Sequence, residues 1–255
     1  MNLLSAQNLG VSVGAKKICD SLTVEFKSAQ CWGILGRNGV GKTTLLHTLS
    51  HLRSEYSGKV ILKDKNINEY KRNSIARTLG IQLQHNEDPF PTSVLDTVLT
   101  GRHPYISNWQ WETDADIAKA KAALDIVEMS GLSGRLVNHL SGGERQRVSL
   151  ATLIAQDPQV FLLDEPNSHL DLNYQINLLS HFTNYASTHK RLLIMSLHDI
   201  NLAARFCSHL LLLTGEGKYI AGSSEDVLNV KNLELTFKHP IREIQDNEKS
   251  IYHPA

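Results

Sequence analysis

The sequence predicts an α/β fold, with helices covering a mainly parallel sheet, an antiparallel β layer at the N-terminus and a helical subdomain inserted in the middle. Three observations predict it. Short apolar runs alternate with helical patterns near both ends of the chain. Apolar and polar residues alternate before Gln30. No convincing strand occurs between about His85 and Leu140. With 255 residues, of which 41% are hydrophobic, the chain is long enough to bury a sizeable core.

The first segment has the pattern of strands with one buried face. Hydrophobic residues alternate with polar ones before residue 30, and alternation of this kind is typical of antiparallel sheets that are solvated on one side. The alternating apolar positions are Leu9, Val11, Val13, Leu22, Val24 and Phe26. We therefore expect an antiparallel β layer here.

The parallel sheet is predicted from apolar runs that are too short for helices and rich in β-branched or bulky residues. These runs span residues 30–35, 160–163, 192–197 and 209–213, and helical patterns cover residues 41–50, 173–187 and 199–206. Strands that alternate with helices in this way favour a parallel sheet covered by helices.

The middle of the chain has a helical pattern. Thr113 is a candidate N-cap, and Ile117, Ala120, Leu124 and Val127 fall on one helical face. Residues 93–101 form a shorter candidate helix. We therefore expect one domain over 1–255, with an α/β core at 1–84 and 141–255 and a helical subdomain at 85–140.

Composition limits the possible functions. Lys plus Arg and Asp plus Glu both number 26, so a general attraction to nucleic acid is not indicated. Three separated cysteines, Cys19, Cys31 and Cys207, suggest neither a disulfide framework nor a zinc site. No signal peptide is expected at Met1, and the longest apolar runs fall far short of the roughly 20 residues that span a bilayer. Any membrane role is therefore expected to come through a partner.

The strongest motif is G-x-x-x-x-G-K-[ST] at residues 36–43, between an expected strand and an expected helix. Its backbone N–H groups and the helix N-terminus can bind phosphate oxygens. Lys42 is expected to reach the β- and γ-phosphates, and Thr43 to bind Mg²⁺. The expected nucleotide-binding residues here are Gly36, Arg37, Asn38, Gly39, Val40, Gly41, Lys42, Thr43 and Thr44.

Two further motifs follow. Asp164 and Glu165 end a strand expected to be buried on both faces, so Asp164 would bind Mg²⁺ and Glu165 would orient or deprotonate the attacking water. Ser141, Gly142 and Gly143 precede another helical pattern. They form either a second anion-binding helix N-terminus or a Gly-rich N-cap alone.

This ordered set of motifs resembles that of ATP-binding-cassette ATPases over nearly the whole chain. The resemblance implies that Ser141 and Gly143 cap the γ-phosphate of a nucleotide bound at Lys42 of a second copy. It makes Gln84 the glutamine that senses Mg²⁺ and γ-phosphate, with Gln82 as a nearby competitor. It also implies that Asp171, in the segment 168–171, couples the two sites, and that His198 contacts the γ-phosphate.

The resemblance implies ATP and Mg²⁺ as ligands and a head-to-tail dimer bound to transmembrane permease subunits at the cytoplasmic face of a bacterial inner membrane, served indirectly by a substrate-binding protein. Residues 89–105 resemble the corresponding stretch in importers of iron–siderophore, heme and vitamin B12. Some molybdate importers share this stretch. The alternative function is that of a soluble ATPase that drives iron–sulfur cluster assembly as part of a scaffold.

Some positions depart from the family or stay open. Val13 replaces an aromatic residue that stacks on adenine in the family, and Arg37 replaces a frequent proline. His47 and His51 are four residues apart on an expected helix, where a solvated face is favoured over a metal site. Trp109 and Trp111 fit either a partner surface or a small core.

Overall fold

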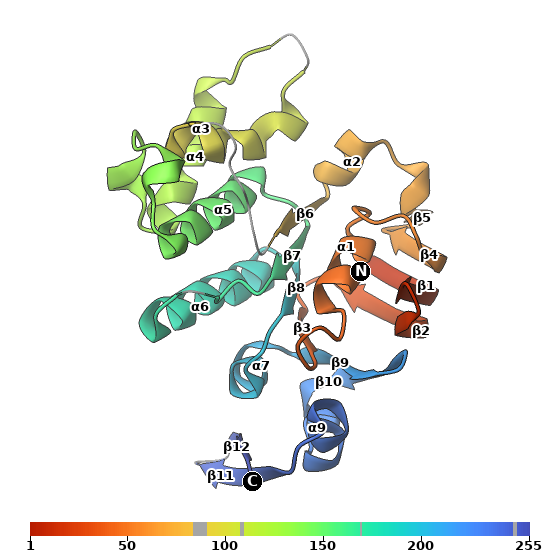
Figure 1. The fold of residues 1–255 in the computed structure, drawn as a ribbon. Helices are drawn as coiled ribbons and strands as arrows, with labels where there is room; N and C mark the ends of the chain where they lie inside the picture. Colours follow the sequence, from red (N-terminus) through yellow and green to blue (C-terminus); the bar gives the residue numbers. More distant parts are fainter. Residues whose placement is uncertain (84–90, 108–109, 169, 247–248) are drawn as a thin grey trace.

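The computed structural model describes residues 1–83, 91–107, 110–168, 170–246 and 249–255. An antiparallel sheet lies on one side of a central sheet, and a group of helices lies on the other (Figure 1). The C-terminal segments extend beyond the edge of the central sheet where β9 and β10 lie (Figure 1). The predicted α/β fold with an antiparallel N-terminal layer and a helical insertion is therefore confirmed.

The N-terminal sheet has the strand order β2-β1-β4-β5. Its strands are β1 (Asn2–Val13), β2 (Lys16–Lys27), β4 (Ser57–Leu62) and β5 (Lys65–Asn66). Five of the six predicted inward residues, Leu9, Val11, Leu22, Val24 and Phe26, are buried. The sixth, Val13, is 47% exposed. The alternating pattern therefore extends along β1 but stops before its last residue.

The central sheet has the strand order β10-β9-β3-β8-β7-β6. The five parallel strands are β3 (Cys31–Leu35), β6 (Leu79–Gln82), β7 (Val160–Asp164), β8 (Leu192–Ser196) and β9 (His209–Gly215), and β10 (Lys218–Ser223) is an antiparallel edge. The four apolar runs predicted as buried strands correspond to β3, β7, β8 and β9. Their ends coincide with the prediction to within two residues.

Two hydrophobic cores lie on the two faces of the central sheet. Alternate residues of a strand enter opposite cores, so Ile34 and Leu162 contribute to one core and Leu35 and Leu163 to the other. The first core is shared with the antiparallel sheet and α1 (Lys42–Leu49). The second is shared with α6 (Leu172–Thr188), α7 (Ile200–Phe206) and the inserted helices. Burial on both faces explains why these strands are continuously apolar.

The inserted region is helical over the residues that the structure describes. It contains α3 (Val94–Leu99), the 3₁₀ segments η2 (Thr100–Tyr105), η3 (Ser130–Leu132) and η4 (Val137–His139), and α4 (Asp114–Ile126). Thr113 is the N-cap of α4, as predicted, and forms a capping box with Asp116. The following helix, α5 (Gly142–Gln156), packs on α3 and α4. The division at 84/85 and 140/141 stays a prediction.

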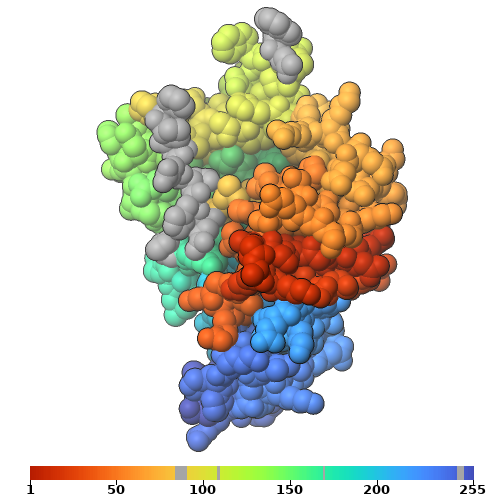
Figure 2. All heavy atoms as spheres, turned by 45° about the vertical axis from the view of Figure 1, so that its right-hand side comes forward, coloured from red at the N-terminus to blue at the C-terminus, as the bar shows by residue number. Residues whose placement is uncertain are grey.

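The remaining segments are short. One group, η1 (Ile67–Glu69) and α2 (Arg72–Ala76), joins the two sheets, and the other, α8 (Ser224–Val227), α9 (Val230–Phe237), β11 (Ile241–Asp246) and β12 (Lys249–Pro254), ends the chain. Asn201 of α7 holds β12 through two hydrogen bonds to the backbone of Tyr252. In the turned view of Figure 2, the N-terminal sheet lies between the helical insertion and these C-terminal segments. Among the described helices, none has the length and apolar character needed to cross a bilayer.

Candidate functional site

The phosphate loop connects β3 to α1, as the motif predicts. Gly39 and Gly41 have φ angles of 72° and 118°, which favour glycine. A Cβ atom at Gly41 would lie 2.6 Å from the side chain of Ile18 on β2. Gly41 therefore allows the loop to pass close to the N-terminal sheet, and α1 begins at the next residue, Lys42.

Lys42 is the cation at the centre of the site. Only 5% of it is exposed, and its ammonium donates a hydrogen bond of 3.0 Å to the carbonyl oxygen of Gly36. Burial lowers the pKa of Lys42, while the negative charges of Glu165 and Asp164 act in the opposite direction. The two carboxylates that the sequence analysis selected therefore act electrostatically on the phosphate-loop lysine.

Asp164 ends β7 and is fully buried. One carboxylate oxygen, Oδ1, accepts a hydrogen bond of 2.6 Å from the hydroxyl of Ser196, which ends the neighbouring strand β8. The other oxygen, Oδ2, is buried without a hydrogen-bond partner among the described residues. A buried carboxylate oxygen is stable only with a partner, and a hard cation is a suitable one.

Glu165 follows Asp164 in a left-handed conformation, with a φ of 50° that is uncommon for a residue with a side chain. Its backbone N–H donates to the hydroxyl of Ser196 at 2.8 Å, which helps to hold this conformation. Its carboxylate contacts the ring of His198 at 2.5 Å and accepts a hydrogen bond of 3.2 Å from Ser168. Glu165 is therefore oriented by contacts from β8 and from the segment that follows β7.

His198 connects Glu165 to Lys42. Its Nε2 contacts Glu165, and its Nδ1 lies 3.4 Å from the ammonium nitrogen of Lys42. An open cleft of about 530 Å³ lies beside these groups and is lined by Gly36, Arg37, Asn38, His198 and Phe237. The structure thus brings a phosphate-binding loop, a cation, two carboxylates and a histidine to the carboxyl ends of β3, β7 and β8. An arrangement of this kind can hold a polyphosphate and orient a water molecule against it.

The second predicted phosphate-binding element, Ser141, Gly142 and Gly143, lies at the start of α5, apart from this cluster. Ser141 is the N-cap of α5 and forms a reciprocal capping box with Glu144, in which the backbone N–H of Ser141 lowers the pKa of the Glu144 carboxyl. Ser141 and Gly142 are exposed. Figure 1 shows α5 on the side of the helical insertion and α1 on the side of the antiparallel sheet. The helix that begins at these residues therefore lies apart from the phosphate-loop helix of the same chain.

Of the remaining predicted site residues, the structure describes Asp171 and Gln82 but not Gln84. Asp171 caps α6 by accepting a hydrogen bond of 2.9 Å from the N–H of Tyr174. Gln84, like Trp109, lies outside the described residues. Its competitor Gln82 is buried at the end of β6 and bonds to the neighbouring carbonyl of Leu83.

The structure also describes His47, His51 and Trp111, which the sequence left open as metal-binding or partner-binding residues. His51 has a φ of 61° beyond the end of α1, so it does not continue the helix of His47. Within the described ranges, no group of three or more His, Cys, Asp or Glu residues is arranged to hold a metal ion. Trp111 is 88% exposed, which excludes a core position for it.

Comparison with known proteins identifies the family. The sequence pattern of the ABC transporter family matches residues 19–168. The chain belongs to the ABC transporter family. The achromobactin transport ATP-binding protein of Dickeya dadantii is 33% identical, with 96% of this chain and 91% of the relative covered. The ferric enterobactin transport ATP-binding protein of Escherichia coli K12 is 34% identical, over 92% of this chain and 86% of that protein.

Solved structures agree with this assignment. An inward-facing metal-chelate-type ABC transporter is 30% identical, has a TM-score of 0.85, and is matched over 99% of this chain and 96% of its own. A nucleotide-free ATP-binding cassette with 19% identity, a TM-score of 0.78 and coverage of 92% and 98% shows the same fold. As an ATP-binding protein of the ABC transporter family, the chain is a nucleotide-binding ATPase.

Sequence reasoning missed Ser196 and Lys16. Ser196 is paired in parallel register with Asp164, so the one polar residue within the expected strand at 192–197 was the available signal. Lys16 begins β2, and its ammonium contacts the carbonyl oxygen of Gly39 in the phosphate loop. No motif marks Lys16, because its position depends on how two separate sheets meet.

Proposed function

We propose that this chain is the ATP-hydrolysing subunit of a bacterial importer for a metal chelate such as an iron–siderophore, heme or cobalamin. The observation that carries the proposal is the juxtaposition of Lys42, Glu165 and His198 in a cassette that is 30% identical, over 99% of its length, to a metal-chelate-type transporter. Relatives named for achromobactin, ferric enterobactin and cobalamin transport support the cargo class.

The proposed chemistry follows from the positions of the groups. The phosphate loop (residues 36–41, with Thr43 and Thr44) binds the triphosphate, and Lys42 compensates charge on the β- and γ-phosphates. Mg²⁺ would be held by Thr43, Asp164 and Gln84 and would neutralise phosphate charge. The unpaired Oδ2 of Asp164 fits that assignment.

Glu165 orients and deprotonates the attacking water, and His198 positions its carboxylate and contacts the γ-phosphate. The short contact between the two side chains supports this division of roles. It also leaves Asp164 to the metal, which is sound because a carboxylate bound to a cation is a poor base.

The proposed assembly contains two copies of the chain in a head-to-tail arrangement, with Ser141, Gly142 and Gly143 of each copy against the nucleotide of the other and Asp171 coupling the two sites. The two cassettes bind two permease subunits at the cytoplasmic face of the inner membrane, and Gln84 with the helical subdomain passes the closing motion to them. An external binding protein delivers the chelate. Exposure of Ser141 and Gly142 supports the contact between copies.

The experiment has two arms. Deleting the gene and measuring uptake of labelled siderophore, heme, cobalamin and molybdate is expected to abolish uptake of one metal chelate, and a wild-type copy but not a Lys42→Ala copy restores it. Affinity purification of the tagged chain is expected to recover membrane permease subunits. Normal uptake of all four compounds, together with lost iron–sulfur enzyme activity and soluble scaffold partners, would instead establish the assembly-scaffold alternative.

A further inference from the structure

The start of β2 lies against the phosphate loop. The side chain of Ile18 occupies the space that a Cβ atom at Gly41 would need, and the ammonium of Lys16 donates a hydrogen bond to the carbonyl oxygen of Gly39. Side chains two residues apart on a strand share a face, so Lys16 and Ile18 both point toward the loop. Among the described contacts, two lysines bond to this loop, Lys16 and Lys42, and the sequence motif accounts for Lys42 alone.

Val13 is the direct partner of Lys16 across the β1–β2 turn. Directly opposed residues share a face of an antiparallel pair, so the side chain of Val13 lies on the same face as that of Lys16. Val13 is 47% exposed and offers a small aliphatic surface without a π-face for stacking a base. At this pair of positions, Lys16 offers the stronger interaction with a nucleotide, because its ammonium can bind a phosphate oxygen directly.

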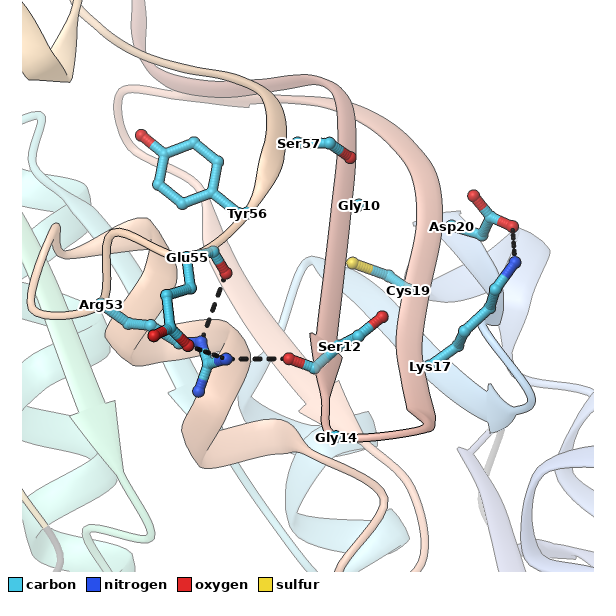
Figure 3. Close-up of a pocket in the computed structure, with 10 residues that line it drawn as sticks. All are labelled: Gly10, Ser12, Gly14, Lys17, Cys19, Asp20, Arg53, Glu55, Tyr56 and Ser57. Carbon is cyan, nitrogen blue, oxygen red and sulfur yellow. Dashed lines mark hydrogen bonds and ion pairs between the residues drawn. The ribbon is translucent and has the colours of Figure 1, made fainter.

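Arg53 holds the end of β1 next to the turn between Val13 and Lys16. The guanidinium of Arg53, which follows α1, donates to the carbonyl oxygen of Ser12 at 2.8 Å and to the carboxylate of Glu55 at 2.9 Å (Figure 3). These groups line a pocket of about 420 Å³ on the opposite face of the strands. The helix that begins with Lys42 is thereby linked to the strand that ends with Val13.

Lys17 provides an internal contrast. It follows Lys16 in the sequence, but its side chain lies on the pocket face, where it pairs with Asp20 at 2.9 Å (Figure 3). It is paired with Ser12 rather than with Val13. Lys16 and Lys17 therefore carry the same charge on the same strand, but of the two only Lys16 contacts the phosphate loop.

We propose that Lys16 binds the nucleotide through its α- or β-phosphate and supplies by charge the affinity that base stacking at Val13 does not. On binding, its ammonium exchanges the carbonyl oxygen of Gly39 for a phosphate oxygen, while Lys42 and His198 hold the γ-phosphate side. This inference rests on nucleotide binding at the phosphate loop. Because phosphate is common to all nucleotides, the contribution is independent of the base, and because the group is solvent-accessible, it weakens with salt.

The test is equilibrium binding of ATP, ADP and GTP to the full chain at low and high salt, for wild type, Lys16→Met, Lys16→Arg and Lys17→Met. We expect Lys16→Met to weaken all three nucleotides about tenfold at low salt and less at high salt. Lys16→Arg retains most of the affinity, and Lys17→Met binds like wild type. Thermal unfolding without nucleotide establishes that each variant is folded, and Lys16→Gln replaces any Lys16→Met protein that is not.

The outcomes separate the two proposals. Equal affinities of Lys16→Met and Lys17→Met, or a loss confined to ATP, would overturn the role of Lys16 while leaving nucleotide binding intact. If the wild-type chain itself bound none of the three nucleotides, the nucleotide site would fail and the role of Lys16 would fail with it.

Discussion

The imidazole Nε2 of His198 lies 2.5 Å from the carboxylate oxygen Oε1 of Glu165. The two residues are 33 positions apart and follow the neighbouring strands β8 and β7. The other ring nitrogen of His198, Nδ1, lies 3.4 Å from the ammonium nitrogen of Lys42. His198 therefore joins the proposed base to the phosphate-binding cation through one ring.

Replacing Glu165 with Gln is expected to reduce ATP hydrolysis by about a hundredfold or more, because the amide cannot accept the proton of the attacking water. ATP binding is expected to persist, since the phosphate loop is unchanged. Steady-state turnover and size-exclusion chromatography with Mg-ATP measure these effects, and the variant should accumulate as a closed dimer. Turnover near that of wild type would exclude Glu165 as the base.

Replacing Ser196 with Ala is expected to lower the free energy of unfolding by about 1–3 kcal/mol, because the buried carboxylate of Asp164 loses its hydroxyl donor. ATP turnover should fall as well, since Ser196 also holds the backbone of Glu165. Denaturant unfolding measures the stability. A suitable control is Ser208→Ala, whose hydroxyl bonds only to neutral groups among its described contacts. An equal effect of both variants would argue against a special role for the carboxylate bond.

The chain is expected to discriminate weakly between ATP and GTP, because Val13 offers no aromatic face. Val13→Tyr should tighten ATP binding about fivefold, which corresponds to a stacking contribution of ~1 kcal/mol. Equilibrium dissociation constants for both nucleotides measure this. A strong ATP preference of the wild-type chain would mean that another residue stacks on adenine.

The ion pair between Arg102 and Asp116 is expected to anchor the helical insertion. It is 2.9 Å long and nearly buried, and Arg102 also donates to the carbonyl oxygen of Ala155. Asp116→Asn should therefore destabilise the protein by ~3 kcal/mol, because a buried guanidinium loses its counter-charge. Asp114→Asn, on the exposed side of the same helical turn, should cost only a few tenths of a kcal/mol. Similar unfolding curves for the two variants would contradict this assignment.

The same ion pair predicts a pH dependence. Hydrogen bonds from Thr113 and Arg102 lower the pKa of Asp116 to about 2, from an ordinary value of 3.8. A folded-state pKa below the unfolded one means that the stabilisation is complete above about pH 4 and is lost as the pH falls toward about 2. The stability difference between wild type and Asp116→Asn should therefore be constant near neutral pH and shrink below pH 4. A difference that grows in acid would have the wrong sign.

The parts of the site that follow from local sequence were predictable. The phosphate loop, the carboxylates of Asp164 and Glu165, and His198 each directly follow an apolar run, and the carboxyl ends of parallel strands meet at one edge of a sheet. Ser196 and Lys16 were not predictable in this way. The first depends on the register of β8 against β7, and the second on how closely the N-terminal sheet approaches the phosphate loop.

The elements of the fold likewise divide into those that local sequence predicts and those that it does not. Predicted strands with continuous apolar runs became β3, β7, β8 and β9, because burial on both faces selects such runs. The short strand β6 carries Gly80 and Gln82 and has a weak pattern, and the C-terminal hairpin mixes charged, polar and apolar residues without a clear period. Val13 deviated from the predicted burial because it is the last residue of β1, beyond Gly10, where the pairing of β1 with β4 ends.

The strand order has a consequence for synthesis of the protein. Strand β3, which leads into the phosphate loop, has β8 and β9 as its two neighbours, and both follow it by more than 150 residues. During synthesis, both edges of β3 therefore lack their native partners until residues 192–215 have left the ribosome. The nucleotide site is therefore completed only when residues 192–196 enter between β3 and β7. We expect this late, non-local pairing to be the step at which misfolding competes with folding.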